Sequence, residues 1–132
     1  MNGVLIQIII PLFAAHLLSD FILQTDEDVK KKQSLFVFGK HILLVTWLSY
    51  QLVGDWGNYI IPLAILFTHS IIDLLKNSIK NDSLFIFSVD QAAHYLVILL
   101  LSLYMQNNVF QETRNIFWYN SFGDTYIKGL II

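Results

Sequence analysis

Four long apolar segments, separated by polar sequence, constrain the fold of this chain more than any other feature. They cover residues 4–24, 41–53, 59–79 and 84–105. A helix needs about 20 predominantly apolar residues to cross a bilayer core, a length that the first, third and fourth segments reach. The second is too short unless it begins upstream, near Ser34. The pattern predicts an all-α polytopic membrane protein built as a four-helix transmembrane bundle.

Composition supports the same class. Of 132 residues, 55% are hydrophobic and 14% charged, and the mean hydropathy is +0.58. This length leaves room for one bundle, residues 1–105, followed by a polar and aromatic tail, residues 106–132. We expect the tail to be an extracytoplasmic loop with an interfacial segment. The apolar ending "GLII" leaves two interpretations open, an interfacial helix or a truncated fifth span.

Charge and cysteine content exclude several functions. The net charge of −2 gives no basic face for a nucleic-acid backbone, so the expected partner is the lipid bilayer, with a homo-oligomer left open. There is no cysteine, so disulfides, iron–sulfur clusters and thiolate zinc sites are excluded. Any metal ion must be held by imidazole, carboxylate or carbonyl groups.

Lysine placement predicts the orientation. Lysines occur at positions 30–32 and 40 between the first two segments, and at 76 and 80 between the last two. The segment "GDWGNY" between the second and third has none. By the positive-inside rule both lysine-rich connections are cytoplasmic, which puts the N-terminus outside. The N-terminal sequence lacks a basic n-region, so we interpret it as a retained first span of a multi-pass protein of the bacterial inner membrane.

Histidine and aspartate recur four residues apart inside three of the apolar segments. On a helix, positions i and i+4 share one face about 6 Å apart. With the predicted topology, all three pairs lie at one level in the cytoplasmic half, where a bundle can direct them to a common centre. The pairs are His16 with Asp20, His69 with Asp73, and Asp90 with His94.

An aspartate near mid-span costs about 2.5–3.5 kcal/mol on insertion scales, so such groups normally mark ion pathways, proton relays or binding sites. Imidazole and carboxylate suit zinc, manganese or ferrous iron. We expect the three paired histidines to be nitrogen ligands, and the three aspartates to be oxygen ligands, orienters or a catalytic base. The predicted supporting residues are His41 at the mouth of the second segment, Gln24 and Gln91.

These motifs resemble the small bacterial inner-membrane proteins grouped as domain-of-unknown-function family 3307. The resemblance covers about residues 10–105 and leaves the tail uncovered. It implies a polytopic bacterial membrane protein and no activity, since none is established for the family. The matching residues are His16, Asp20, Phe21 and Gln24 in the first segment, His41 opening the second, His69 and Asp73 in the third, and Asp90, Gln91 and His94 in the fourth.

Three functions remain open at this point. A divalent metal could activate water in a hydrolase acting on a membrane-associated substrate. The same layer could belong to a metal-ion or proton transporter or channel component, although the outer halves of the spans carry few polar residues, and an oligomer would have to supply the missing walls. Finally, the pairs could be helix-packing contacts of a structural or partner-binding protein.

Overall fold

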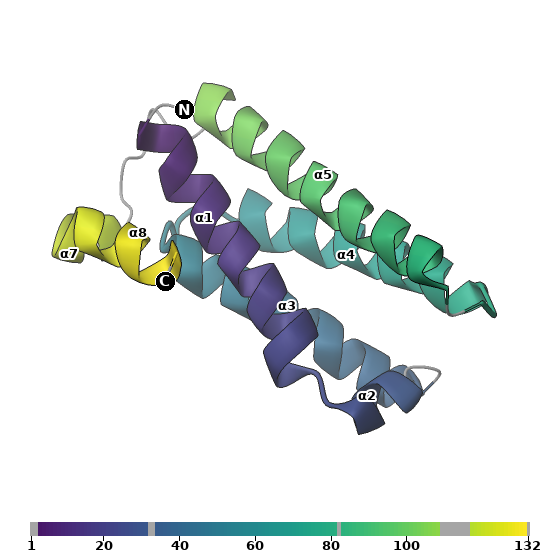
Figure 1. The fold of residues 1–132 in the computed structure, drawn as a ribbon. Helices are drawn as coiled ribbons and strands as arrows, with labels where there is room; N and C mark the ends of the chain where they lie inside the picture. Colours follow the sequence, from purple (N-terminus) through teal and green to yellow (C-terminus); the bar gives the residue numbers. More distant parts are fainter. Residues whose placement is uncertain (1–2, 32–33, 82, 109–116, 132) are drawn as a thin grey trace.

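The computed structural model describes residues 3–31, 34–81, 83–108 and 117–131, and every regular element in these ranges is a helix (Figure 1). The predicted all-α fold is therefore confirmed. Residues 109–116, which belong to the predicted outer loop, and the lysine at position 32 lie outside the described part. The helices are α1 (Gly3–Leu17), η1 (Leu18–Leu23), α2 (Asp26–Lys30), α3 (Leu35–Val53), α4 (Ile60–Ser78), α5 (Leu84–Asn108), α7 (Phe117–Phe122) and α8 (Asp124–Ile131).

Four helical stretches are long and apolar enough to cross a membrane: Leu5–Leu23, Leu35–Val53, Ile60–Ser78 and Leu84–Asn107. They match the four predicted spans, and the second begins at Leu35, as its length required. In the bundle, α1 packs against α3 and α5, and α4 packs against the same two helices. Each long helix thus has two neighbours, and the four enclose a common interior (Figure 1).

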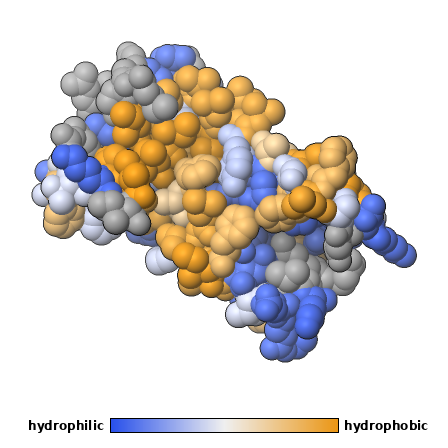
Figure 2. All heavy atoms as spheres, viewed as in Figure 1, coloured by the Kyte–Doolittle hydropathy of each residue, from blue (hydrophilic) through white to orange (hydrophobic). Residues whose placement is uncertain are grey.

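The bundle has an apolar exterior. Large hydrophobic side chains on its outer faces are more than half exposed, among them Leu43, Phe67 and Leu96. Hydrophobic residues cover most of the middle of the face seen in Figure 2, with hydrophilic residues mostly toward its ends. An exposed apolar surface of this extent marks an interaction with lipid or protein. Together with the lengths of the four helices, it indicates a membrane protein.

The interior is divided into an apolar and a polar layer. The apolar layer fills the half of the bundle that holds the start of α1 and the end of α5. Its buried side chains are Ile8, Leu12, Val45, Val53, Ile61, Ile65, Ile98, Leu101 and Met105. The polar layer lies in the other half and contains the histidines and aspartates of the predicted site. The two layers position this site toward the end of the bundle where α2 lies (Figure 1).

Three acidic residues after the first span, Asp26, Glu27 and Asp28, start the short helix α2. The Asp28 backbone N–H donates to Thr25 Oγ1 at 3.1 Å, and the Thr25 N–H donates to Asp28 Oδ2 at 3.2 Å. This reciprocal pair is a capping box, which satisfies donors at the start of α2. The Thr25 backbone amide, and then Lys40, hold the pKa of Asp28 below its usual range. The T-x-x-D pattern of Thr25 and Asp28 is the sequence signature of this cap.

The tail docks on the end of α3. The Phe117 N–H donates to the carbonyl of Gly54 at 3.0 Å, and Trp118 Nε1 donates to the carbonyl of Gln51 at 2.6 Å. The Tyr126 hydroxyl donates to the carbonyl of Leu52. Gly54 has a φ of +73°, the left-handed conformation that glycine adopts most readily after a helix. The described tail is therefore two short helices packed on the bundle, with α8 against α1.

Candidate metal centre

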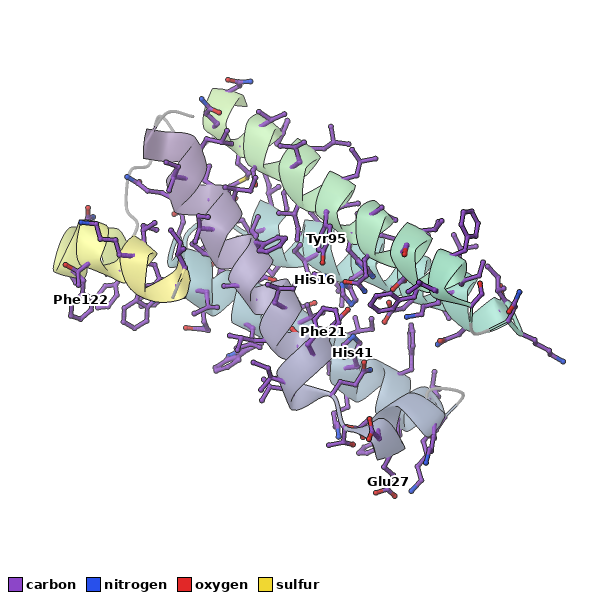
Figure 3. The ribbon with its side chains drawn as sticks, in the orientation of Figure 1. His16, Phe21, Glu27, His41, Tyr95 and Phe122 are labelled. Carbon is purple, nitrogen blue, oxygen red and sulfur yellow. The ribbon has the colours of Figure 1, made fainter. Side chains whose placement is uncertain are left out.

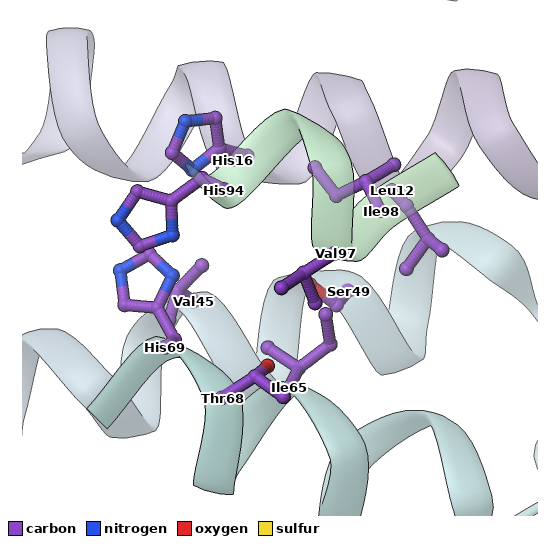
Figure 4. Close-up of a pocket in the computed structure, with 10 residues that line it drawn as sticks. All are labelled: Leu12, His16, Val45, Ser49, Ile65, Thr68, His69, His94, Val97 and Ile98. Atoms are coloured by element: carbon purple, nitrogen blue, oxygen red, sulfur yellow. The ribbon is translucent and has the colours of Figure 1, made fainter. Parts of the chain in front are cut away.

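Each of the four long helices contributes one histidine to the polar layer. His16 comes from α1, His41 from α3, His69 from α4 and His94 from α5, and each is at most 4% exposed. Their rings form a chain, with centroid distances of 5.2 Å for His41–His69, 4.2 Å for His69–His94 and 4.8 Å for His94–His16. Figure 4 shows the rings of His16, His69 and His94 gathered together beside apolar side chains.

The three aspartates lie among these rings. The within-helix pairs make the predicted contacts, at 3.7 Å between His16 Nδ1 and Asp20 Oδ2, 3.7 Å between His69 Nε2 and Asp73 Oδ2, and 3.6 Å between His94 Nε2 and Asp90 Oδ1. The structure therefore brings all six paired residues together, as the spacing predicted. Seven ionisable side chains, these six and His41, make up what we call the His/Asp cluster.

Two imidazole nitrogens and two carboxylate oxygens of the cluster lie close together. His41 Nε2 lies 3.2 Å from His69 Nε2, 3.3 Å from Asp20 Oδ1 and 3.4 Å from Asp73 Oδ2. His69 Nε2 lies 3.8 Å from Asp20 Oδ1 and 3.7 Å from Asp73 Oδ2. Donors about 2.0–2.2 Å from a tetrahedral zinc ion stand roughly 3.3–3.6 Å apart. We call these four atoms the tetrahedral set, because they are the candidate ligands of a four-coordinate site.

His41 departs from the prediction. We expected it at the mouth of the second span, in a supporting role, whereas it is 3% exposed and contacts three members of the tetrahedral set. The reason is that α3 begins at Leu35, which places His41 almost two turns inside the helix. It is thus as well placed to bind an ion as His69.

A π-helical turn positions Asp20. The first span changes at Leu18 from an α-helix to the π-helix η1. The wider turn lets Asp20 contact His16 on its own span while Oδ1 reaches His41 on α3. The Ser19 hydroxyl, completely buried, donates to the carbonyl of Ala15 at the same turn. Single π-helical turns inside α-helices frequently occur at functional sites.

A second group of donors lies beside the first. Asp73 uses its other oxygen, since Oδ1 lies 3.3 Å from His94 Nε2, and the same nitrogen is 3.6 Å from Asp90 Oδ1. His94 Nε2 and Asp90 Oδ1 are buried and make no aligned hydrogen bond with any described residue. We call Asp73 Oδ1, Asp90 Oδ1 and His94 Nε2 the open set, because it has three donors.

Gln91 and Lys76 support the cluster from its edge. Gln91 Nε2 donates to Asp90 Oδ2 at 3.1 Å, so its carbonyl oxygen faces His16 Nε2, also at 3.1 Å, and accepts a hydrogen bond from it. Gln91, one of the predicted supporting residues, therefore contacts the cluster. Lys76 Nζ donates to Asp90 Oδ2 at 3.0 Å. Sequence analysis used Lys76 only as a topology signal, although it follows Asp73 by three residues on the same helix face.

Gln24 is the predicted supporting residue without a contact to the cluster. It follows η1, and its Nε2 atom is buried and has no hydrogen-bond partner among the described residues. The end of η1 at Leu23 turns the backbone at Gln24 into an extended conformation. On a regular helix Gln24 would share a face with Asp20 and His16, four and eight residues before it, but the backbone at Gln24 is no longer helical.

Two cavities border the cluster. A small one of about 10 Å³, near the size needed for one water molecule, lies between the three rings of Figure 4 and the apolar layer, beside Ser49 and Thr68. A larger one of about 160 Å³ lies between α4 and α5. Its walls are apolar except for Lys76 and Asp90. The cluster is thus closed by apolar packing on one side and bordered by a cavity at Asp90. Figure 3 shows two members of the cluster, His16 and His41, between the helices of the bundle.

The cluster carries a negative charge when its imidazoles are neutral. Three carboxylates and the Lys76 ammonium leave a formal charge of −2 in a largely buried layer. A buried charge of this size is costly unless an opposite charge accompanies it. One divalent cation would neutralise it. Three overlapping groups of these residues could each hold such an ion: His16, His69 and His94; Asp20, His41 and His69; and Asp73, Asp90 and His94.

Fold and site together define a helical membrane protein with a buried His/Asp cluster. A family model described as "Protein of unknown function (DUF3307)" matches residues 8–120, which include every residue of the cluster. The chain belongs to this family, for which no activity is established. The match extends to residue 120, beyond the expected limit near residue 105, and so covers the first part of the tail. Comparisons with curated proteins and with solved structures give no match.

Proposed function

We propose that this protein is a membrane-embedded, metal-dependent hydrolase whose cluster binds a divalent cation, zinc in first place, at the tetrahedral set. The observation that carries this proposal is the set of five donor-to-donor distances of 3.2–3.8 Å among Asp20, His41, His69 and Asp73. Two imidazoles and two carboxylates supply nitrogen and oxygen ligands that zinc accepts. Manganese and ferrous iron accept the same donors with a different geometry.

A purely structural role explains the cluster less well. Helix-packing contacts would satisfy the buried polar atoms by hydrogen bonds. Here Asp20 Oδ1, Asp90 Oδ1, His16 Nδ1 and His94 Nε2 are buried without an aligned hydrogen bond to any described residue. A cation at the tetrahedral set would replace the missing hydrogen bond of Asp20 Oδ1 and offset the negative charge of the cluster.

The surroundings of the cluster favour an enzyme over a transporter. Conduction needs a polar route through the whole bundle. The half opposite the cluster is packed with nine buried apolar side chains, and its buried Ser102 donates to the carbonyl of Ile98. The 160 Å³ cavity at Asp90, in contrast, offers an apolar site beside charged groups. We propose an amphipathic substrate whose apolar part occupies this cavity.

The chain's own residues have defined parts in the proposed reaction. Asp90 borders the cavity and is placed to accept a proton from a water molecule, while Lys76 is placed to pair with an anionic group of the substrate. A bound divalent ion would supply an acidified water molecule at neutral pH. The water oxygen bonds to the electrophilic atom of the substrate, and the leaving group departs with a proton.

The membrane and the orientation are part of the proposal. We place the protein in the bacterial inner membrane with the N-terminus outside, which puts the cluster toward the cytoplasmic face. The support is the lysine distribution: Lys30, Lys31 and Lys40 lie at the same end of the bundle as Lys76 and Lys80, the end nearer the cluster.

Metal analysis of protein purified in detergent without added chelator tests the binding step. We expect at least one zinc ion per chain in the wild type and a loss of at least half of it in Asp20→Asn. Asp26→Asn is the matched control, because Asp26 is an exposed carboxylate of α2 outside the cluster. Metal-free wild-type protein that stays metal-free after incubation with zinc, manganese and iron would contradict the proposal.

Reconstitution into vesicles tests the reaction. Wild-type protein in vesicles of phosphatidylethanolamine and phosphatidylglycerol, supplied with zinc, should release hydrolysis products that mass spectrometry detects, and Asp90→Asn should not. An unchanged lipid profile would contradict a hydrolase acting on these lipids. A zinc-sensitive dye inside the same vesicles serves as the second readout. Zinc entry that depends on the protein would favour the transporter instead.

A further inference from the structure

We infer that the cluster binds two divalent cations, the second at the open set, with Asp73 bridging the two ions through its two carboxylate oxygens. This inference rests on the proposed function and extends it from a mononuclear to a dinuclear site.

The arrangement of Asp73 is the first argument. Its Oδ2 atom belongs to the tetrahedral set, 3.4 Å from His41 Nε2, and its Oδ1 atom lies 3.3 Å from His94 Nε2. One carboxylate therefore presents each oxygen to a different group of nitrogen donors, on helices α3 and α5. Pairs of catalytic metal ions about 3.5–4 Å apart are a recurring arrangement in hydrolytic enzymes.

Independent evidence comes from the open set itself. The side chains of Asp90 and His94 are 4% and 3% exposed, yet Asp90 Oδ1 and His94 Nε2 make no aligned hydrogen bond with a described residue. His94 Nε2 lies 3.3 Å from Asp73 Oδ1 and 3.6 Å from Asp90 Oδ1, separations typical of ligands on one ion. The three residues form one of the groups that could hold an ion. Buried polar atoms without a hydrogen bond are rare and call for an explanation.

Coordination number separates the roles of the two ions. The tetrahedral set supplies four protein donors, which is typical of a structural ion without an open coordination position. The open set supplies three, which leaves a position for water or substrate. Asp90 borders the 160 Å³ apolar cavity, so that position lies next to the volume where an amphipathic substrate would be held.

Charge indicates the substrate class. Two divalent cations bring the layer from a formal charge of −2 to +2, and a bound hydroxide lowers this to +1. A substrate with a single negative charge at the scissile group would complete the neutralisation in a largely buried site. A phosphodiester that carries an apolar chain has this charge, and Lys76 Nζ is already at the edge of the open set. We therefore assign the substrate class as amphipathic phosphodiesters.

Metal stoichiometry of the full chain in lipid nanodiscs tests the second ion. We expect two manganese ions per chain at saturation in the wild type and in the control Asp26→Asn, and one in Asp90→Asn, which leaves the tetrahedral set intact. One ion per wild-type chain would overturn this inference while the proposed function stands. No bound ion would overturn both. Circular dichroism and gel filtration check that each variant is folded.

Electron paramagnetic resonance of the manganese-loaded protein tests the bridge. Two ions bridged by Asp73 should give an exchange-coupled spectrum, and Asp90→Asn should give the six-line spectrum of an isolated ion. Two bound ions that show only uncoupled spectra in the wild type would contradict the bridge. For the substrate class, a phosphodiester-linked lipid should compete with inorganic phosphate for the loaded protein, whereas a neutral diacylglycerol should not.

Discussion

Replacing Asp73 by asparagine should make the metal-free protein more stable than the wild type. With metal bound, the wild type should be the more stable of the two. Without metal, Asp73 shares His41 Nε2 with Asp20 and His94 Nε2 with Asp90. One ring nitrogen carries at most one proton, so it cannot donate to two carboxylates at once. Removing the Asp73 charge therefore relieves a conflict between carboxylates in the metal-free protein.

The expected magnitudes follow from burial and from linkage. Asp73 is 2% exposed and lies five residues before the end of α4. A carboxylate at mid-span costs about 2.5–3.5 kcal/mol and less near the interface, so the neutral amide should stabilise the metal-free protein by about 1–2 kcal/mol. Zinc at 1,000 times its dissociation constant should stabilise the wild type by about 4 kcal/mol. The variant, which lacks a ligand of both sets, should gain much less.

Titration with sodium dodecyl sulfate unfolds the protein in mixed micelles, and tryptophan fluorescence follows the transition. The unfolding midpoints give the effect of the substitution without metal and the stabilisation by zinc. Each protein is titrated once with chelator and once with zinc, and Asp26→Asn serves as the charge-matched control. If Asp73 only holds helices together, the variant is less stable than the wild type under both conditions and zinc has no effect on either. That result would refute the reasoning.

Two other predictions concern the ends of the bundle. Gly54→Ala should destabilise the protein by about 1–2 kcal/mol because of its left-handed backbone conformation alone. The loss should be larger, because the added methyl group would lie 2.7 Å from Trp118 Cδ1. At Gly57 an added methyl group has no neighbour within 4 Å, so the control Gly57→Ala should leave the unfolding midpoint unchanged. Because the chain has no cysteine, a membrane-impermeant maleimide added to intact cells should label Gly57→Cys and spare Lys80→Cys; the reverse pattern would contradict the proposed orientation.

The bundle and most of the cluster were predictable because they depend on segment length and on the spacing of residues within one helix. Segment length fixes the number of spans, and the i, i+4 spacing places Asp73 beside His69 and Asp90 beside His94 on any regular helix. The second span had to begin before His41 to cross the membrane, and α3 does begin at Leu35. The same extension implied that His41 is inside the bundle, a consequence that the sequence analysis did not draw.

The remaining features depend on contacts between helices or on backbone irregularity, for which one sequence carries no clear signal. The four donors of the tetrahedral set come from three different spans, and their mutual distances depend on helix packing. The π-helical turn that positions Asp20 has no motif of its own. Lys76 was predicted only as a topology signal. Its contact with the cluster depends on an aliphatic stem that extends along an apolar wall while the ammonium reaches Asp90.

Zinc K-edge X-ray absorption of the wild-type protein, loaded with one equivalent of zinc in nanodiscs, tests the central claim most directly. The account predicts four nitrogen and oxygen ligands at about 2.0–2.1 Å, with the multiple scattering of two imidazoles. It also predicts that His41→Ala loses one imidazole contribution while Asp26→Asn keeps both. A spectrum of six oxygen ligands without imidazole scattering, unchanged by His41→Ala, would contradict a metal site in this cluster.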